Sequence, residues 1–358
     1  MKKILVKLSD RSYPIFVGAK LESLGRQLTG LKLSKTALIV TNPKIGKLYL
    51  SKVSGGLKKA GFKVNSVIIP DGEQYKRLEV VSKIYNAAIK AGLDRRSPVI
   101  ALGGGVVGDV AGFAAATYLR GVPLIQVPTT LLAMVDSSIG GKTGVDLKEG
   151  KNLVGAFYQP KLVWIDVSTL KTLPREHIEN GLGEVIKYAV IKDVKLFQYL
   201  ESVLSSKNQI PDTRYQILIE RCCAIKAVVV SMDEYEKKGV REILNFGHTF
   251  GHALETLNGY TGILHGQAVA IGMNFAASLA VKLNLFKKSD KARLTNLILQ
   301  AGLGACSLKR FTAAQVIEVM KRDKKTRDGK LRFVLPIKIG KVIVKSNISE
   351  GKIKEIVG

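Results

Sequence analysis

The sequence predicts an α/β fold, with a parallel sheet in the first half and a mainly helical second half. Up to about residue 170, short β-branched apolar runs alternate with amphipathic stretches. Runs that are apolar throughout are typical of parallel strands covered on both faces. After Thr172-Leu173-Pro174 the apolar spacing becomes helical. Because 358 residues exceed the usual size of one core, we expect two domains, residues 1–174 and 175–358.

The first half begins with a predicted hairpin and continues with interior strands. Ile4–Leu8 and Tyr13–Val17 flank the polar segment Asp10-Arg11-Ser12, which predicts an antiparallel pair. Helical spacing over Glu79–Ala91 predicts an amphipathic helix between the second and third interior strands. The five predicted interior strands are Ala37–Thr41, Val64–Ile69, Val99–Leu102, Leu124–Val127 and Leu162–Ile165.

The second half is predicted to be mostly helical. Gln267–Leu283 carries no charge before Lys282 and is rich in Ala, Gly and Ser, as expected of a helix packed on all sides. Apolar alternation over Leu331–Val344, with Gly340 inside it, predicts one late hairpin. The other predicted helices are Ile178–Val190, Tyr215–Val230 and Thr249–Leu257.

The composition indicates a globular cytoplasmic protein. A hydrophobic content of 46% and a charged content of 24% exclude a disordered, collagen-like or coiled-coil chain. The uncharged stretch Thr256–Val281 is interrupted by polar residues, and its apolar part, Ala268–Val281, is too short for a membrane span. The N-terminus turns polar too early for a signal peptide. Cys222, Cys223 and Cys306 form no disulfide framework and no CxxC pair, which favours a reducing compartment.

The net charge of +27 lies on the flanks of the sequence. Residues 1–100 hold 20 Lys and Arg against 6 Asp and Glu, and residues 281–358 hold 19 against 6. The centre is neutral, with 17 of each. We interpret the excess as solvated surface, with steering of an anionic substrate and nucleic-acid binding as alternatives. Since the aromatic residues show no stacking pattern, we expect no nucleic-acid partner.

A glycine-rich segment follows a predicted strand and opens a helix. Ala101–Asp109 satisfies GxGxxG through Gly103, Gly105 and Gly108. Such glycines let backbone N–H groups approach a diphosphate at a helix N-terminus. The segment follows the third interior strand and has no acid about 20 residues on, so a tight strand–helix turn is the alternative. Asp71–Lys76 could supply the missing acid.

A second glycine-rich segment, Ser137–Thr143, resembles a P-loop but lacks its first glycine, because Asp136 occupies that position. This excludes a nucleoside triphosphatase of that type. A turn remains that presents Lys142 near Asp136, with Lys151 and Asn152 following. Lys and Asn groups near glycine turns suit an anionic ligand such as phosphate, and a solvent-exposed turn is the alternative.

Three of the four histidines fall close together. His248 and His252 stand at i and i+4, a spacing with which helices bind zinc, and His265 follows a short loop. Two imidazoles and a carboxylate would leave a ligand position open for substrate. Buried core histidines are the alternative. Glu184 and Lys187, at i and i+3, have the spacing of ordinary surface neighbours. Cys222 and Cys223 are interpreted as small core residues.

Taken together, these segments resemble the 3-dehydroquinate synthase family, collinearly over nearly the whole chain. The motifs that carry the resemblance are Asp71–Lys76, Gly103–Asp109, Gln126-Val-Pro-Thr-Thr130, Asp136–Asp146, Lys151-Asn152, Gly183-Glu-Val-Ile-Lys187, Leu244–His252, His265-Gly266, Arg322-Asp-Lys-Lys325 and Leu331–Val334.

The resemblance implies an N-terminal domain of modified Rossmann type that binds NAD and a helical C-terminal domain that binds a divalent metal, zinc or cobalt. It implies the metal ligands Glu184, His248 and His265, with His252 contacting substrate instead. The NAD-binding residues it implies are Asp71, Gly72, Glu73, Gln74, Tyr75, Lys76, Gly105, Val106, Val107, Gly108, Asp109, Thr129, Thr130, Lys142, Lys151, Thr169, Leu170, Lys171 and Thr172.

The resemblance also implies a phosphorylated sugar acid, 3-deoxy-D-arabino-heptulosonate 7-phosphate, as substrate, and a homodimer. NAD-mediated oxidation, phosphate elimination, reduction and aldol closure would give 3-dehydroquinate. Another sugar-phosphate cyclase or a metal-dependent polyol dehydrogenase is the alternative.

The resemblance implies that Arg120 would reach a neighbouring subunit. The segment Asp233–Arg241 is one residue longer than the family pattern, which leaves the role of Glu236 open. The substrate-contacting residues it implies are Asp136, Lys142, Asn152, Lys187, Lys226, Arg241, Asn245, His252, Lys324 (or Lys325) and Arg120.

Overall fold

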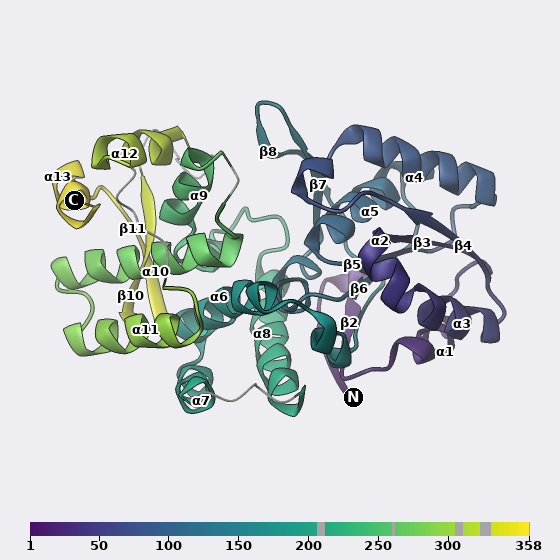
Figure 1. The fold of residues 1–358 in the computed structure, drawn as a ribbon, viewed down its shortest axis with the longest axis horizontal. Coiled ribbons are helices and arrows are strands. Elements are labelled where there is room, and N and C mark those ends of the chain that lie inside the picture. The colour runs from purple at the N-terminus through teal and green to yellow at the C-terminus, as the bar shows by residue number, and fades with distance from the viewer. Residues whose placement is uncertain (206–211, 260–261, 305–310, 323–330, 358) are drawn as a thin grey trace. The chain divides into compact units, whose positions relative to one another are not determined.

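A computed structural model describes residues 1–205, 212–259, 262–304, 311–322 and 331–357 (Figure 1). Lys324, Lys325 and Cys306 lie outside the described residues. The chain divides into two compact units, which we treat separately: unit 1 comprises residues 1–173 and 212–235, and unit 2 comprises residues 174–211 and 236–358.

Unit 1 is built on a seven-stranded sheet of order β1-β2-β9-β6-β5-β3-β4. β1 and β2 form the predicted antiparallel hairpin, and the remaining neighbours run parallel. All five predicted interior strands are confirmed, with ends shifted by one residue at most. The strands are β1 (Lys2–Val6), β2 (Tyr13–Val17), β3 (Thr36–Thr41), β4 (Lys63–Ile68), β5 (Val99–Gly103), β6 (Leu124–Pro128) and β9 (Leu162–Ile165).

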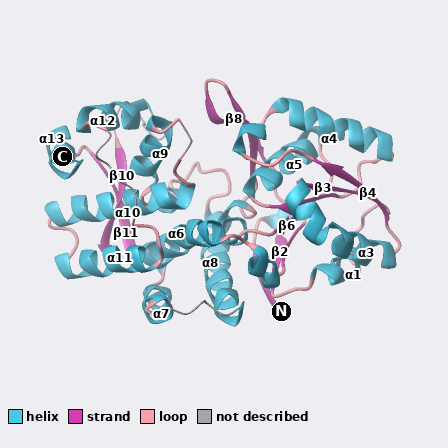
Figure 2. Ribbon diagram, in the orientation of Figure 1, coloured by secondary structure: helices cyan, strands magenta, loops and turns pink. Residues whose placement is uncertain are grey.

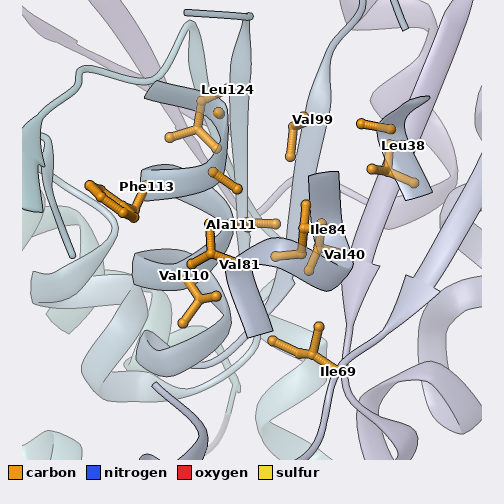
Figure 3. Packing of buried hydrophobic residues seen from close by; sticks show 14 of the residues in the cluster. Leu38, Val40, Ile69, Val81, Ile84, Val99, Val110, Ala111, Phe113 and Leu124 are labelled. Atoms are coloured by element: carbon orange, nitrogen blue, oxygen red, sulfur yellow. The ribbon is translucent and has the colours of Figure 1, made fainter. Parts of the chain in front are cut away.

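Helices cover both faces of this sheet, as the apolar strand sequences predicted. Side chains alternate along β3, so Leu38 and Val40 pack with helices α4 (Leu78–Ala91) and α5 (Gly105–Thr117) (Figure 3). Ala37 and Ile39 pack on the other face with α1 (Leu24–Thr29) and α3 (Ser51–Lys59). Since both faces are buried, a polar residue has no place at either set of positions.

A second hairpin in unit 1, β7 (Lys142–Leu147) and β8 (Gly150–Phe157), was not predicted. Its sequence is poor in strand-forming residues because glycines stand where the two backbones meet. A Cβ on Gly144 would lie 2.6 Å from the Val154 carbonyl oxygen, and one on Gly155 would collide with Thr143. The hairpin carries Lys142, Lys151 and Asn152, which the sequence had placed in turns.

The helix α8 (Asp212–Met232) also belongs to unit 1. Its buried side chains include Cys222 and Cys223, small core residues as interpreted, and it packs against β1 and the turn around Asp136. The expectation that residues 175–358 form one helical domain therefore differs from the structure in this helix. The buried side chains of α8 are the reason, because they lie against β1, β2 and two helical turns of the unit that precedes it.

Unit 2 is mainly helical (Figure 2). The helices predicted over residues 178–190, 249–257 and 267–283 are confirmed, as is the late hairpin, in which Gly340 takes a positive φ of 87° at the turn. Within the described residues no helix is long and apolar enough to cross a membrane. The elements are α6 (Arg175–Lys192), α7 (Val194–Leu204), α9 (His248–Leu257), α10 (His265–Lys282), α11 (Lys288–Gln300), α12 (Ala313–Arg322), β10 (Arg332–Lys338), β11 (Lys341–Ser346) and α13 (Glu350–Val357).

Short helical turns connect these elements. They are Ser9–Arg11, Leu21–Ser23, Pro43–Ile45, Gly46–Leu50, Glu73–Tyr75, Tyr118–Arg120, Ala133–Ser137, Val167–Thr172 and Val240–Asn245.

Candidate functional site

One carboxylate and two imidazoles converge in unit 2. Glu184 comes from the middle of α6, while His248 and His265 are the first residues of α9 and α10. Oε1 of Glu184 lies 3.6 Å from Nε2 of His248 and 3.6 Å from Nε2 of His265. One ligand atom from each of the three lies within 4.8 Å of the other two. This is the geometry of three ligands around one cation.

Glycines allow the three helices to approach closely enough for this convergence. A Cβ on Gly183 of α6 would lie 2.6 Å from the carbonyl oxygen of Gly266, the residue after His265. A Cβ on Gly266 would collide with the backbone of Asn180, whose side chain accepts a hydrogen bond from the Gly266 amide at 2.5 Å. On α9, a Cβ on Gly251 would meet the backbone of α10 at 2.9 Å. Glycine next to a ligand residue is thus a packing requirement.

Both imidazoles have their Nδ1 atoms engaged. Nδ1 of His248 lies 3.2 Å from the carbonyl oxygen of Phe246, and Nδ1 of His265 lies 3.4 Å from Oε2 of Glu255. In both rings Nδ1 faces a hydrogen-bond acceptor and Nε2 faces Glu184. Metal-binding histidines are commonly held in this way, with one nitrogen toward an acceptor and the other toward the metal. Burial acts to lower the pKa of His265, but the Glu184 and Glu255 carboxylates outweigh it and raise that pKa to about 10. Two nitrogens and a carboxylate oxygen fit zinc or cobalt.

His252 lies beside these ligands without joining their set. Its ring centroid is 5.3 Å from that of His248 and 6.0 Å from that of His265. The i, i+4 spacing suggested that His248 and His252 bind a metal together. In the structure His248 instead shares a candidate metal site with Glu184 and His265. His252 shares a second acid and imidazole cluster with Glu255 and His265.

Glu184 and Lys187 are a buried ion pair, 0% and 1% exposed, and not the surface neighbours that their spacing suggested. α6 is surrounded by other elements of unit 2, which spacing along one helix cannot reveal. Arg241, also buried, lies 3.2 Å from Oε1 of Glu236, so the carboxylate and guanidinium pair despite the longer segment between them. Asn245 is half-buried at the end of the turn that carries Arg241.

In unit 1, the glycine-rich segment is the junction between β5 and α5. Gly103 ends the strand, Gly104 is the N-cap, and no side chain caps the first turn of the helix. The amide of Thr129 donates to Gly103 at 2.9 Å, while the Thr129 hydroxyl is buried and makes no hydrogen bond within the described residues. The backbone N–H groups in the first turn of α5 and the Thr129 hydroxyl are hydrogen-bond donors beside glycine residues. Such donors fit the diphosphate of a dinucleotide.

Lys76 joins the other cofactor-binding and substrate-contacting candidates of unit 1. Its ammonium lies 2.6 Å from Oδ2 of Asp109 and donates to Oδ1 of Asn152 at 2.6 Å. The backbone N–H of Asn152 donates to Oδ1 of Asp146 at 2.7 Å. Burial acts to lower the pKa of Lys76, but Asp109 and Glu73 outweigh it and the pKa lies above its usual value. Burial raises the pKa of Asp109. Lys76 therefore remains charged and holds three segments together.

Other candidates in unit 1 have partners of their own. The Lys226 ammonium donates to the carbonyl and Oδ1 oxygens of Asp136, both at 2.7 Å. Lys151 lies 3.4 Å from Glu73. Asp71 accepts from Asn42 at 2.7 Å, the Thr130 hydroxyl accepts from the Ala133 amide at 3.2 Å, and the Thr172 hydroxyl lies 2.5 Å from the Tyr49 hydroxyl. Gln74, Tyr75, Lys142, Lys171 and Arg120 are exposed.

Two polar residues in these clusters were missed by sequence reasoning. Glu255 faces His265, and Asp146 accepts from the Asn152 amide. The signal for Glu255 was present, since His248, His252 and Glu255 stand at i, i+4 and i+7, on one helix face. Asp146 gave no such signal because the hairpin that brings it to Asn152 was not predicted.

Two protein-family models match consecutive parts of the chain. Residues 66–180 match the 3-dehydroquinate synthase N-terminal family, and residues 181–326 match the 3-dehydroquinate synthase C-terminal family. The 3-dehydroquinate synthase of Rippkaea orientalis is 49% identical over 356 residues, which cover 99% of this chain and 97% of that protein.

Solved structures of related cyclases share the fold. A 2-deoxy-scyllo-inosose synthase complexed with carbaglucose-6-phosphate, NAD+ and Co2+ is 30% identical, with a TM-score of 0.89 over 99% of both chains. The 2-epi-5-epi-valiolone synthase of Streptomyces hygroscopicus, with NAD+ and Zn2+ bound, is 28% identical, with a TM-score of 0.88 over 100% of this chain and 98% of that one. On the strength of both family matches and nearly half-identical relatives of full length, this chain belongs to the 3-dehydroquinate synthase family.

Proposed function

We propose that the chain converts 3-deoxy-D-arabino-heptulosonate 7-phosphate to 3-dehydroquinate and phosphate, using NAD and a divalent cation, zinc or cobalt. The observation that carries the proposal is the convergence of Glu184, His248 and His265 in a member of this family. The reaction combines alcohol oxidation, phosphate elimination, carbonyl reduction and aldol closure. It requires a cation site, a dinucleotide site and cationic groups for a phosphorylated acid, and the chain has candidates for all three.

Glu184 and the Nε2 atoms of His248 and His265 would hold the cation. Bound at these three ligands, a cation would supply Lewis-acid chemistry that polarises a substrate hydroxyl. The positive charge of Lys187 compensates the negative charge of Glu184 in the buried site. The acceptors at both Nδ1 atoms fix the ring orientations before a cation arrives.

The β5–α5 junction would hold the diphosphate of NAD, and the loop 71–76 would hold another part of the dinucleotide. A dinucleotide held there would supply reversible hydride transfer with the substrate alcohol, so that none would be consumed. Gly104 and Gly105 keep the backbone N–H groups accessible, and Thr129 offers its hydroxyl. Lys76 fixes the loop 71–76 to α5 through Asp109, which orders the binding surface before the dinucleotide arrives.

The cationic side chains would bind the carboxylate and phosphate of the substrate. Lys226 is directed by Asp136 and Arg241 by Glu236, so each cation is oriented by an acid of its own unit. Asn152 is likewise held between Lys76 and Asp146. Each charge-assisted hydrogen bond contributes about 1.5–3 kcal/mol. Several of them together bind a phosphate firmly, and because each one is moderate, they can break one after another when the phosphate leaves. Lys142, Lys187, Asn245 and His252 complete the proposed contacts of the described residues.

We further propose that the chain acts as a homodimer in the cytoplasm. Arg120 supports the first part, because it lies exposed in the turn that follows α5, where a second copy of the chain can reach it. The absence of a CxxC pair or a disulfide framework in the sequence supports the second. Sedimentation velocity of the purified chain tests the dimer, which a single monomer boundary would contradict.

Product analysis tests the reaction. Purified protein is incubated with the heptulosonate phosphate, trace NAD and zinc. We expect 3-dehydroquinate and one equivalent of phosphate, with no net NADH. Stoichiometric NADH without phosphate would indicate a polyol dehydrogenase. Phosphate release only from a different sugar phosphate would indicate another cyclase. Either of these results would refute the proposed reaction.

A further inference from the structure

We propose that Glu255 is a positioning residue of the metal site: it fixes the ring of His265 and raises the basicity of its Nε2, and thereby sets the affinity for the cation. The inference rests on the cation site of the proposed function. It concerns a residue that is not one of the three ligands and that lies on α9, while His265 lies on α10.

The contact itself assigns the role. Oε2 of Glu255 lies 3.4 Å from Nδ1 of His265, on the opposite side of the ring from Nε2, which lies 3.6 Å from Glu184. Glu255 is 8% exposed, so the contact lies largely away from water. A neutral imidazole that donates from Nδ1 to a carboxylate offers its lone pair at Nε2, and the negative charge makes that lone pair a stronger donor to a metal.

The second histidine provides an internal comparison. Nδ1 of His248 faces the uncharged carbonyl oxygen of Phe246, so its ring is oriented without a nearby negative charge from that partner. The two imidazoles therefore differ in their Nδ1 partners, which are a backbone carbonyl for His248 and a carboxylate for His265.

The same geometry argues against Glu255 as a cation ligand. Glu255, His252 and His265 also lie within ligand distance of one another. One neutral imidazole has a single lone pair, so His265 cannot donate from Nε2 to a cation beside Glu184 and from Nδ1 to another beside Glu255. The set with Glu184 is the more buried of the two, with Glu184 and His248 both buried, whereas only Glu255 is buried in the other set.

The test measures metal affinity without substrate or NAD. Glu255→Gln keeps an acceptor for Nδ1 but removes the charge, and Glu255→Ala removes both. Zinc affinity is measured by competition with a chromogenic chelator, and the visible spectrum of the Co2+ form reports ligand geometry. Glu201→Gln is the matched control, because Glu201 pairs with Arg293 elsewhere in unit 2. Thermal unfolding of the metal-free variants establishes that each is folded.

We expect zinc to bind about 10- to 100-fold more weakly to Glu255→Ala, with a smaller loss for Glu255→Gln and none for the control. The Co2+ spectrum should keep the band positions of the three-ligand site. Unchanged affinity in both Glu255 variants would overturn the proposal, as would complete loss of stoichiometric binding, which would make Glu255 a ligand. Because no turnover is measured, these results stand apart from the product analysis that tests the reaction.

Discussion

The Lys76 ammonium lies 2.6 Å from the Asp109 carboxylate, which joins the loop after β4 to the first turns of α5. Lys76→Met leaves Asp109 without this partner, so we expect a loss of about 2 kcal/mol in the free energy of unfolding. We also expect weaker NAD binding. Urea unfolding and NAD titration measure the two effects.

A double-mutant cycle with Asp109→Asn separates the interaction energy between Lys76 and Asp109 from the interactions that each residue makes with other groups. If the two groups interact directly, the double variant loses less stability than the sum of the single variants, by about 1 kcal/mol. Strictly additive losses would mean that the contact contributes nothing.

His265→Ala removes one of the three ligands. We expect metal content and turnover to fall to background while the circular dichroism spectrum is retained, because buried apolar side chains of α6, α9 and α10, such as Ile186, Phe250 and Met273, hold these helices together. His177→Ala is the control, since His177 lies on α6 near an exposed Glu176. Metal analysis by mass spectrometry and a turnover assay decide. Full activity in a metal-free His265→Ala would refute the ligand assignment.

Lys142→Ala should weaken the binding of substrate and NAD together, because the resemblance gives this residue a place in both sets. Loss of a charged hydrogen bond predicts about a tenfold rise in KM for each. Lys148→Ala, in the turn of the same hairpin, should leave both constants unchanged. Should KM for both ligands stay at the wild-type value in Lys142→Ala, Lys142 does not belong to the site.

Gly266→Ala tests the helix contact that positions His265. The added methyl group would collide with the Asn180 backbone, and overpacking of this kind costs about 1–3 kcal/mol. We expect a lower melting temperature and weaker metal binding. Gly351→Ala in α13 meets nothing within 4 Å and should be neutral or slightly stabilising. Equal melting temperatures for the two variants would argue against the close contact.

The buried thiol of Cys223 predicts that the free energy of unfolding depends on pH. Burial raises the pKa of the Cys223 thiol far above its ordinary value of 9.0. Below about pH 8 both the folded and the unfolded state hold the proton, so the thiol adds no pH dependence. Above pH 9 only the unfolded state loses it, and the free energy of unfolding falls. In a Cys306→Ser background, a thiol reagent at pH 8 should label no cysteine until denaturant is added, and rapid labelling of the native protein would contradict the burial.

Much of the fold could be predicted because strands buried on both faces, such as those around Leu38 and Leu102, have continuous apolar sequences. The hairpin β7–β8 could not, because Gly144 and Gly155 are required by close backbone approach and weaken the strand signal. The three-ligand set needed the family resemblance. Spacing alone pointed to His248 and His252, since Glu184 lies on another helix and local periodicity carries no information about contacts between helices.

The most direct test of the account is the position of the cation. A crystal of the zinc-loaded protein, measured at the zinc absorption edge, should show one anomalous peak about 2.0–2.2 Å from the Glu184 carboxylate and from Nε2 of His248 and His265. A peak bound instead by His252 and Glu255, or the absence of any peak at the three predicted ligands, would contradict it.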